Sequence, residues 1–181
     1  MKTRWYVLVT LVAAASAGWV ATRSEEESHL LRTVSLRKMA DSLHAVIAAN
    51  RSVYLRLALE DAQRGQFPAH AEILRQANFA IQAEGAEFSY TLRSLQPIHP
   101  RQGPQTEVEL RGLHSVAERP EETYTTRETL GGRSYYTAIY AERATMSACV
   151  ECHNAHPESP RRDYRLGDVL GAVVVRIPLE F

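Results

Sequence analysis

The chain has 181 residues, of which 45% are hydrophobic and 23% are charged. These values are typical of one globular domain with an additional segment, and they exclude a disordered or fibrous protein. Lysine plus arginine and aspartate plus glutamate each number 21, so the formal net charge is zero. This balance argues against a protein that binds nucleic acid.

The N-terminal segment predicts export from the cytoplasm. Lys2 and Arg4 precede an apolar run from Trp5 to Ala21, which is typical of a secretory signal. The run is close to the shortest length that spans a bilayer, so an uncleaved anchor is the alternative. We therefore interpret residues 1–23 as a signal peptide or membrane anchor. Residues 24–181 are expected outside the cytoplasmic membrane, either soluble in the periplasm or held at the inner membrane.

Two helices are predicted next, because apolar residues recur at helical spacing. The first runs from about residue 28 to 63, and its apolar stripe has one gap, at Asn50. Its charged residues Asp41 and Arg51 lie off the stripe and are expected in solvent. A second helix is predicted over 68–84, with Gly65 and Pro68 before it and Gly85 after it. The long helix also offers a surface through which the chain could form a homodimer. The stripe consists of Leu36, Met39, Ala40, Leu43, Val46, Ile47, Val53, Tyr54 and Leu57.

The pattern then changes to that of an antiparallel sheet. Alternation over 87–95 predicts a strand, and Thr106 with Glu109 predicts a capped short helix through Leu113. The segments 124–130 and 133–142 flank two glycines and predict a hairpin. Residues 167–179 predict a strand that is apolar on both faces and therefore central. The fold class is α+β: a long N-terminal helical segment followed by a mostly antiparallel sheet, with a cysteine-bearing helix inserted before the last strand.

The segment "SACVECHNAH" holds both cysteines of the chain, spaced Cys-x-x-Cys and followed at once by a histidine. This spacing is typical of covalent haem c attachment. One helical turn separates the thiols of Cys149 and Cys152, which would form thioether bonds to the two haem vinyl groups. The adjacent His153 would bind the iron. Aromatic and apolar residues upstream either wall the haem or belong to the core of the sheet: Tyr135, Tyr136, Tyr140 and Met146.

Two other chemistries use the same residue types. A zinc site would take Cys149, Cys152 and His153 or His156, with a fourth ligand from elsewhere, but structural zinc sites usually draw on a second paired cluster, which the sequence does not offer. A redox disulfide is expected near a βαβ unit rather than after an antiparallel hairpin. The exported context favours one covalently attached haem c over both alternatives.

The C-terminal half resembles a bacterial family of single-haem, c-type domains with a PAS-like fold, long known only as a domain of unknown function. The resemblance is carried by Cys-x-x-Cys-His at 149–153 and by Gly-Asp-Val-x-Gly-Ala at 167–172. It implies a PAS-like haem domain over 24–181 that acts alone in the periplasm or as the sensing part of a kinase or chemoreceptor. The chain departs from the family in having His99-Pro100 where many relatives have Asn-Pro. It also lacks the upstream third cysteine of some relatives, which the resemblance places as a distal haem ligand.

Other side chains are candidates for the remaining contacts to the haem. His70 opens the second predicted helix in the segment where the extra cysteine of relatives would fall, and it is our candidate for the second metal ligand. His44, His99 and Met146 are the alternatives, although His44 flanks the apolar stripe and is expected to pack there. His156 lies too close to His153 to reach the opposite haem face, while His29 and His114 are expected on the surface. Three arginines are candidates for the haem propionates: Arg93, Arg161 and Arg162.

These observations predict a haem-binding protein that senses redox change or a small gas such as NO, CO or O2. A periplasmic single-haem electron carrier is the alternative. No nucleophile–base pair accompanies the motif in the sequence, so no enzymatic activity is expected. The chain carries no kinase or receptor domain, so a sensor would need a separate signalling protein, and a carrier would need a redox partner. Only the N-terminal segment is expected to meet the membrane.

Overall fold

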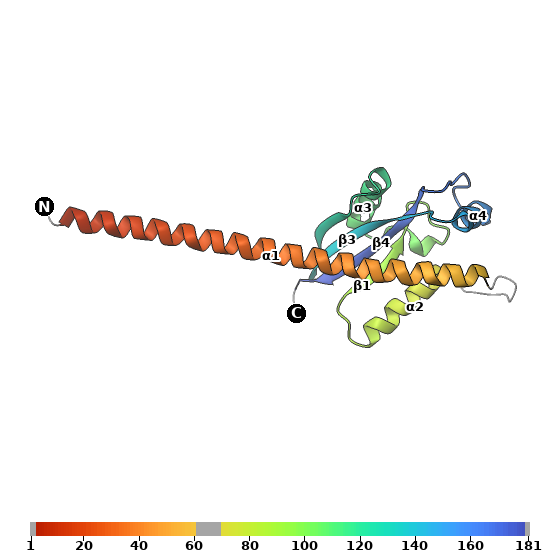
Figure 1. Cartoon of the computed structure of the whole chain (residues 1–181), viewed down its shortest axis with the longest axis horizontal. Helices are drawn as coiled ribbons and strands as arrows, with labels where there is room; N and C mark the ends of the chain where they lie inside the picture. The colour runs from red at the N-terminus through yellow and green to blue at the C-terminus, as the bar shows by residue number, and fades with distance from the viewer. Residues whose placement is uncertain (1–2, 61–69, 180–181) are drawn as a thin grey trace. The chain divides into compact units, whose positions relative to one another are not determined.

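The computed structural model describes the backbone of residues 3–60 and 70–179, and the side chains of residues 25–58 and 71–179. Figure 1 shows these residues as helices and one sheet. In chain order the elements are α1 (Thr3–Glu60), α2 (His70–Ala83), β1 (Ser89–Arg93), the 3-10 helix η1 (Pro100–Gln102), α3 (Glu107–Glu118), β2 (Tyr124–Leu130), β3 (Arg133–Arg143), α4 (Ser147–Ala155) and β4 (Val169–Pro178). The chain divides into two compact units, Met1–Met39 and Ala40–Phe181.

The second unit is built on a four-stranded antiparallel sheet, so the α+β fold is confirmed. Its strand order is β1-β4-β3-β2, which makes β4 a central strand, as its apolar sequence predicted. β2 and β3 form the predicted hairpin, in which Leu130 pairs with Arg133. Gly131 and Gly132 both have positive φ, 56° and 81°, which a two-residue turn of this kind requires and which glycine adopts without strain.

The sheet is covered on both faces. On one face, α3 packs Leu113 and Val116 against Ile139 of β3 and Val174 of β4. Side chains alternate along a strand, so Tyr140, one residue further along β3, lies on the other face. There it meets the part of α1 that belongs to the second unit, and its hydroxyl donates to Asp41 at 2.8 Å. α2 lies beside β1 (Figure 1), an edge strand, and Asn78 Oδ1 accepts a hydrogen bond from the Tyr90 N–H at 2.9 Å.

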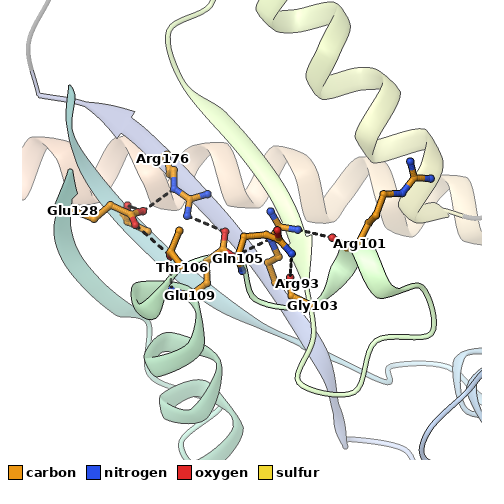
Figure 2. A network of polar contacts seen from close by, with 9 residues as sticks. Arg93, Arg101, Gly103, Gln105, Thr106, Glu109, Glu128 and Arg176 are labelled. Carbon is orange, nitrogen blue, oxygen red and sulfur yellow. Dashed lines mark hydrogen bonds and ion pairs between the residues drawn. The ribbon is translucent and has the colours of Figure 1, made fainter. Parts of the chain in front are cut away.

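Beneath α3 lies a buried network of charged side chains, drawn in Figure 2. The guanidinium of Arg176 on β4 donates to Glu109 at 2.8 Å and to Glu128 at 2.6 Å. Thr137 donates to the same Glu128 oxygen at 2.6 Å, and Arg93 pairs with Glu109 at 3.0 Å. Two arginines therefore face two glutamates, and the network joins α3 to β1, β2 and β4 without a net charge.

Several predicted boundaries are corrected. α1 begins at Thr3 rather than near residue 28, because the helix runs without interruption through the apolar N-terminal segment. α3 continues past Leu113 to Glu118. β1 is shorter than the predicted 87–95, and the predicted helix start and stop signals Gly65 and Pro68 lie outside the described residues.

The predicted cap of α3 is half correct. The Thr106 hydroxyl accepts from the Glu109 N–H at 3.1 Å, as expected of an N-cap residue. The Glu109 carboxylate does not complete a capping box: it accepts from the Gln105 N–H at 2.6 Å, one residue before the cap. Arg93 and Arg176 of the buried network also contact this carboxylate, so Glu109 links α3 to the sheet as well as binding the backbone before the helix.

Candidate functional site

The cysteine motif forms a short helix, α4, between the two central strands. Met146 precedes the helix as its N-cap residue. Cys149, Cys152 and His153 stand at positions i, i+3 and i+4, so the three side chains share one helix face. Cys149 is half-buried, Cys152 is exposed, and neither is in a disulfide. A single turn of helix thus presents two free thiols and one imidazole on the same side.

The loop after α4 holds the helix against the end of the sheet. Ala144 N–H donates to the Asp168 carbonyl, and the Gly167 N–H donates back to the Ala144 carbonyl, both at 2.9 Å. The Asn154 amide makes two further bonds with the backbone of Tyr164, at 2.9 and 3.0 Å. Below the helix a small apolar cluster forms where Cys149 packs, made of Ala144, Tyr164 and Leu170. The motif therefore sits on a fixed backbone.

The side chain of His153, a residue of α4, is half-buried. Its ring meets the ring of Tyr164 edge-on, with centroids 5.6 Å apart and an interplanar angle of 82°. Its Nδ1 is buried without a hydrogen-bond partner. Burial, and then the charges of His156 and Arg51, lower the pKa of His153 below its ordinary value. The imidazole is therefore uncharged at neutral pH and keeps a ring nitrogen without an internal partner, which is the state that binds a metal.

The face of α1 that meets the sheet carries polar side chains beside the buried Ala40 and Ile47, which corrects the sequence prediction for Arg51. Arg51 was expected in solvent, yet its side chain is only 10% exposed and pairs with Glu142 of β3. His44 stacks on Tyr140, with ring centroids 4.0 Å apart and an interplanar angle of 5°, so its expected packing role is observed. His44 Nε2 lies 3.8 Å from the Glu142 carboxylate. His44 Nε2 and Arg51 Nε are both buried without a hydrogen-bond partner.

Sequence reasoning missed Arg51 and Glu142 as neighbours of the motif. The positive charge of Arg51 contributes to the lowered pKa of His153, the candidate ligand. The available signal was weak: Arg51 is seven residues, or two helical turns, after His44 and therefore shares its side of the helix. Nothing in the sequence indicated that a strand far along the chain would supply the matching carboxylate.

Among the described side chains, no other histidine joins Cys149, Cys152 and His153 in a group that could bind a metal. His70 is the first residue of α2, but its side chain lies outside the described residues. His99 caps η1, with Nδ1 accepting from the Arg101 N–H at 3.2 Å. His156 ends α4, and its Nδ1 accepts from the Glu158 N–H at 3.2 Å.

The three candidate propionate arginines all have partners. Arg93 belongs to the buried network below α3 and also donates to the Arg101 carbonyl at 2.7 Å. Arg161 pairs with Asp163 and Asp168 at 2.7 and 2.8 Å, and lies over the Tyr164 ring at 4.3 Å. Arg162 donates to the Pro157 carbonyl at 2.7 Å. Of these, Arg161 comes nearest the motif, since the ring it covers is also the ring that His153 touches.

Among the residues whose side chains are described, no three or more histidine, cysteine, aspartate or glutamate side chains gather as a metal site. Within the same residues, no helix is long and apolar enough to cross a membrane. The predicted export or anchor segment, Trp5 to Ala21, lies outside them.

Comparison with known proteins identifies the family. Residues 21–178 match the Tll0287-like family. Among solved structures, the chain is similar to the crystal structure of the cyanobacterial haem protein Tll0287, with 18% identity, a TM-score of 0.47, and coverage of 77% of this chain and 96% of that one. No curated protein matches the chain. The match to the family spans most of the chain, including the whole of the second unit up to residue 178, and the chain therefore belongs to the Tll0287-like family.

Proposed function

We propose that the chain binds one haem c, attached covalently to α4. The observation that carries the proposal is the shared face of Cys149, Cys152 and His153, with an uncharged imidazole whose Nδ1 has no partner. Membership of a family named after a cyanobacterial haem protein supports the same cofactor. Cys-x-x-Cys-His is the sequence pattern of c-type attachment.

Each residue of the motif has a separate task in this proposal. The thiols of Cys149 and Cys152 would hold the haem through two thioether bonds, each formed by addition of S–H across one vinyl group, so that no oxidant is needed. His153 would bind the iron through an imidazole nitrogen. The haem would supply a one-electron couple and a metal that a small gas could bind.

Buried polar atoms at the motif support a bound group of this chemistry. His153 Nδ1 is buried without a hydrogen-bond partner, and so is Nε of Arg51, whose charge contributes to the lowered pKa of His153. Buried polar atoms in proteins are normally satisfied, so such a group of exceptions calls for an explanation. A haem carries a metal and two carboxylates, which are the partners that imidazole and guanidinium nitrogens take.

We infer that the haem domain serves as a sensor module for redox state or a small gas, without enzymatic activity. The support lies in α1, which touches β3 through Asp41 and Arg51, while β3 leads directly into α4. A structural change at α4 could therefore reach the long helix α1 through a single strand, β3. Electron transfer is the second candidate, favoured by the exposure of Cys152, which would hold one haem edge near solvent.

The N-terminal segment supports an exported location, and haem c is attached outside the cytoplasmic membrane in bacteria. A sensor would pass its signal to a separate protein at that membrane, while a carrier would dock a redox partner. Reduced protein should be titrated with CO and NO while its Soret band is recorded. A shift at low gas concentration supports the sensor for gases; an unchanged spectrum with a reversible potential supports redox sensing or electron transfer.

A further inference from the structure

The long helix α1 leaves an apolar stripe uncovered in the second unit. Its residues follow the alternating 3- and 4-residue spacing of a coiled-coil seam: Leu43, Val46, Asn50, Val53 and Leu57. Val46, Val53 and Leu57 are 59%, 46% and 53% exposed. Met39, which is 48% exposed, continues the same spacing upstream, so the pattern covers six successive seam positions. Leu36 continues the spacing in the sequence but is buried.

This seam is distinct from the face that α1 turns toward the sheet. Ala40 and Ile47 are buried, and His44 and Arg51 contact β3. At 100° per residue, these four positions lie about a quarter to a third of a turn around the helix from the seam. The domain therefore packs against a mixed face of α1, made of Ala40 and Ile47 together with His44 and Arg51. The exposed seam residues lie outside this face.

We infer that this seam binds a second copy of the chain, as a parallel two-stranded coiled coil in register at Asn50. Asn50 carries the argument for a second copy. It is exposed and occupies the centre of the seam, in the position where a single asparagine fixes register and strand number at a cost in stability. The Asn50 amide nitrogen donates to the Val46 carbonyl at 2.9 Å within the helix. A different apolar helix would bury the rest of the amide without a partner, whereas an identical seam brings a second amide to meet it.

The parallel direction follows from the same residue. Two parallel helices related by a two-fold axis place each seam residue opposite its own copy, so Asn50 meets Asn50 and Val46 meets Val46. Residues 43–57 extend about 21 Å along the helix, at 1.5 Å per residue. This is enough for two turns of seam on each side of Asn50, and the interface leaves the polar contacts of α1 with β3 intact. The inference does not depend on a bound haem.

The first test is the mass of the full chain by sedimentation velocity over a range of concentrations. The account predicts a dimer, twice the 20.3 kDa chain plus any bound cofactor. Val46→Glu should raise the dissociation constant at least about tenfold, because each dimer would bury two carboxylates. Ser52→Glu, on an exposed position off the seam, is the matched control and should leave the dimer unchanged. A monomeric wild type, or equal effects of the two variants, would overturn the inference.

Two further variants test register and direction. Val46→Cys should form an intermolecular disulfide under mild oxidation well above the wild-type background, and Ser52→Cys should not. Asn50→Leu should tighten association, or admit higher oligomers, because it removes the polar residue from the seam. A dimer that forms no disulfide at position 46, or one whose affinity falls in Asn50→Leu, contradicts a parallel seam centred on Asn50. Haem absorbance in the same samples keeps this result separate from the proposed function.

Discussion

At the scale of single residues, His153 is the side chain on which the candidate site depends. Its lowered pKa and unpartnered Nδ1 both follow from burial on α4. The Cys-x-x-Cys-His motif could be found from the sequence because it is local: three residues on one helical turn carry the whole pattern. The partners of Arg51 could not be found in that way, since Glu142 reaches it only through the folding of β3 against α1.

The second axial ligand is predicted to be His70. His70→Ala should turn a low-spin ferric spectrum high-spin, because two imidazoles give a strong ligand field and one does not. His44→Ala is the comparison variant, as His44 is one of the alternative ligands and its side chain stacks on Tyr140. If His44→Ala loses the low-spin spectrum and His70→Ala keeps it, the second ligand is His44 of α1 rather than His70. A wild-type spectrum that is already high-spin would mean that the iron has no second histidine.

The buried carboxylate of Glu109 should make the stability of the fold sensitive to acid. Burial alone would raise its pKa, but the Gln105 N–H and the guanidinium groups of Arg176 and Arg93 outweigh burial and hold it below the ordinary 4.5. Because the folded-state pKa is the lower one, this stabilisation is fully present above the unfolded pKa. It is lost as the pH falls through the folded pKa.

Urea denaturation of wild type and Glu109→Gln, from neutral pH to below 4.5, measures this contribution. The variant should lose about 3 kcal/mol at neutral pH, since it leaves buried guanidinium groups without part of their countercharge. Its free energy of unfolding should then depend less on pH than that of the wild type. Parallel pH dependences in the two proteins would show that Glu109 titrates alike in the folded and unfolded states.

At the scale of elements, the sequence predicted the features that depend on residues close together in the chain. The hairpin follows from Gly131 and Gly132, and the central place of β4 follows from its apolar character on both faces. The orientation of α1 was not predictable in this way. Ala40 and Ile47 of its predicted apolar stripe are buried, whereas Val46, Val53 and Leu57 are exposed. Tyr140 and Glu142 of the sheet contact the polar residues Asp41 and Arg51 beside the buried part of the stripe.

The contact between α3 and the sheet rests on a close approach at Gly112. A Cβ at this position would lie 2.2 Å from Ile139 Cδ1 and 2.9 Å from the Tyr124 ring. Gly112→Ala should therefore destabilise the fold by about 1 to 3 kcal/mol, even though alanine is the better helix former. His114→Ala, on the exposed side of α3, is the control and should not destabilise. Thermal or urea unfolding measures both, and a stabilised Gly112→Ala would show that the helix can move away from β3.

At the scale of the whole molecule, the N-terminal segment is predicted to direct export of the domain. Residues 1–40 fused to a reporter that is active only in the periplasm should give activity, because positive charge precedes the apolar run. Replacing Val9 and Val12 with aspartate should abolish it by interrupting that run. A fusion that remains cytoplasmic would contradict export. The chain would then not reach the compartment in which haem c is attached.

The most direct test of the account is the mass of the protein at its cysteine motif. The chain should be produced in cells that attach haem c, extracted with acidified acetone, and digested with trypsin. The account predicts that the peptide between Arg143 and Arg161 keeps one haem, and that Cys149→Ala with Cys152→Ala releases it. A wild-type peptide that carries two free thiols and no haem after this treatment would contradict the central claim.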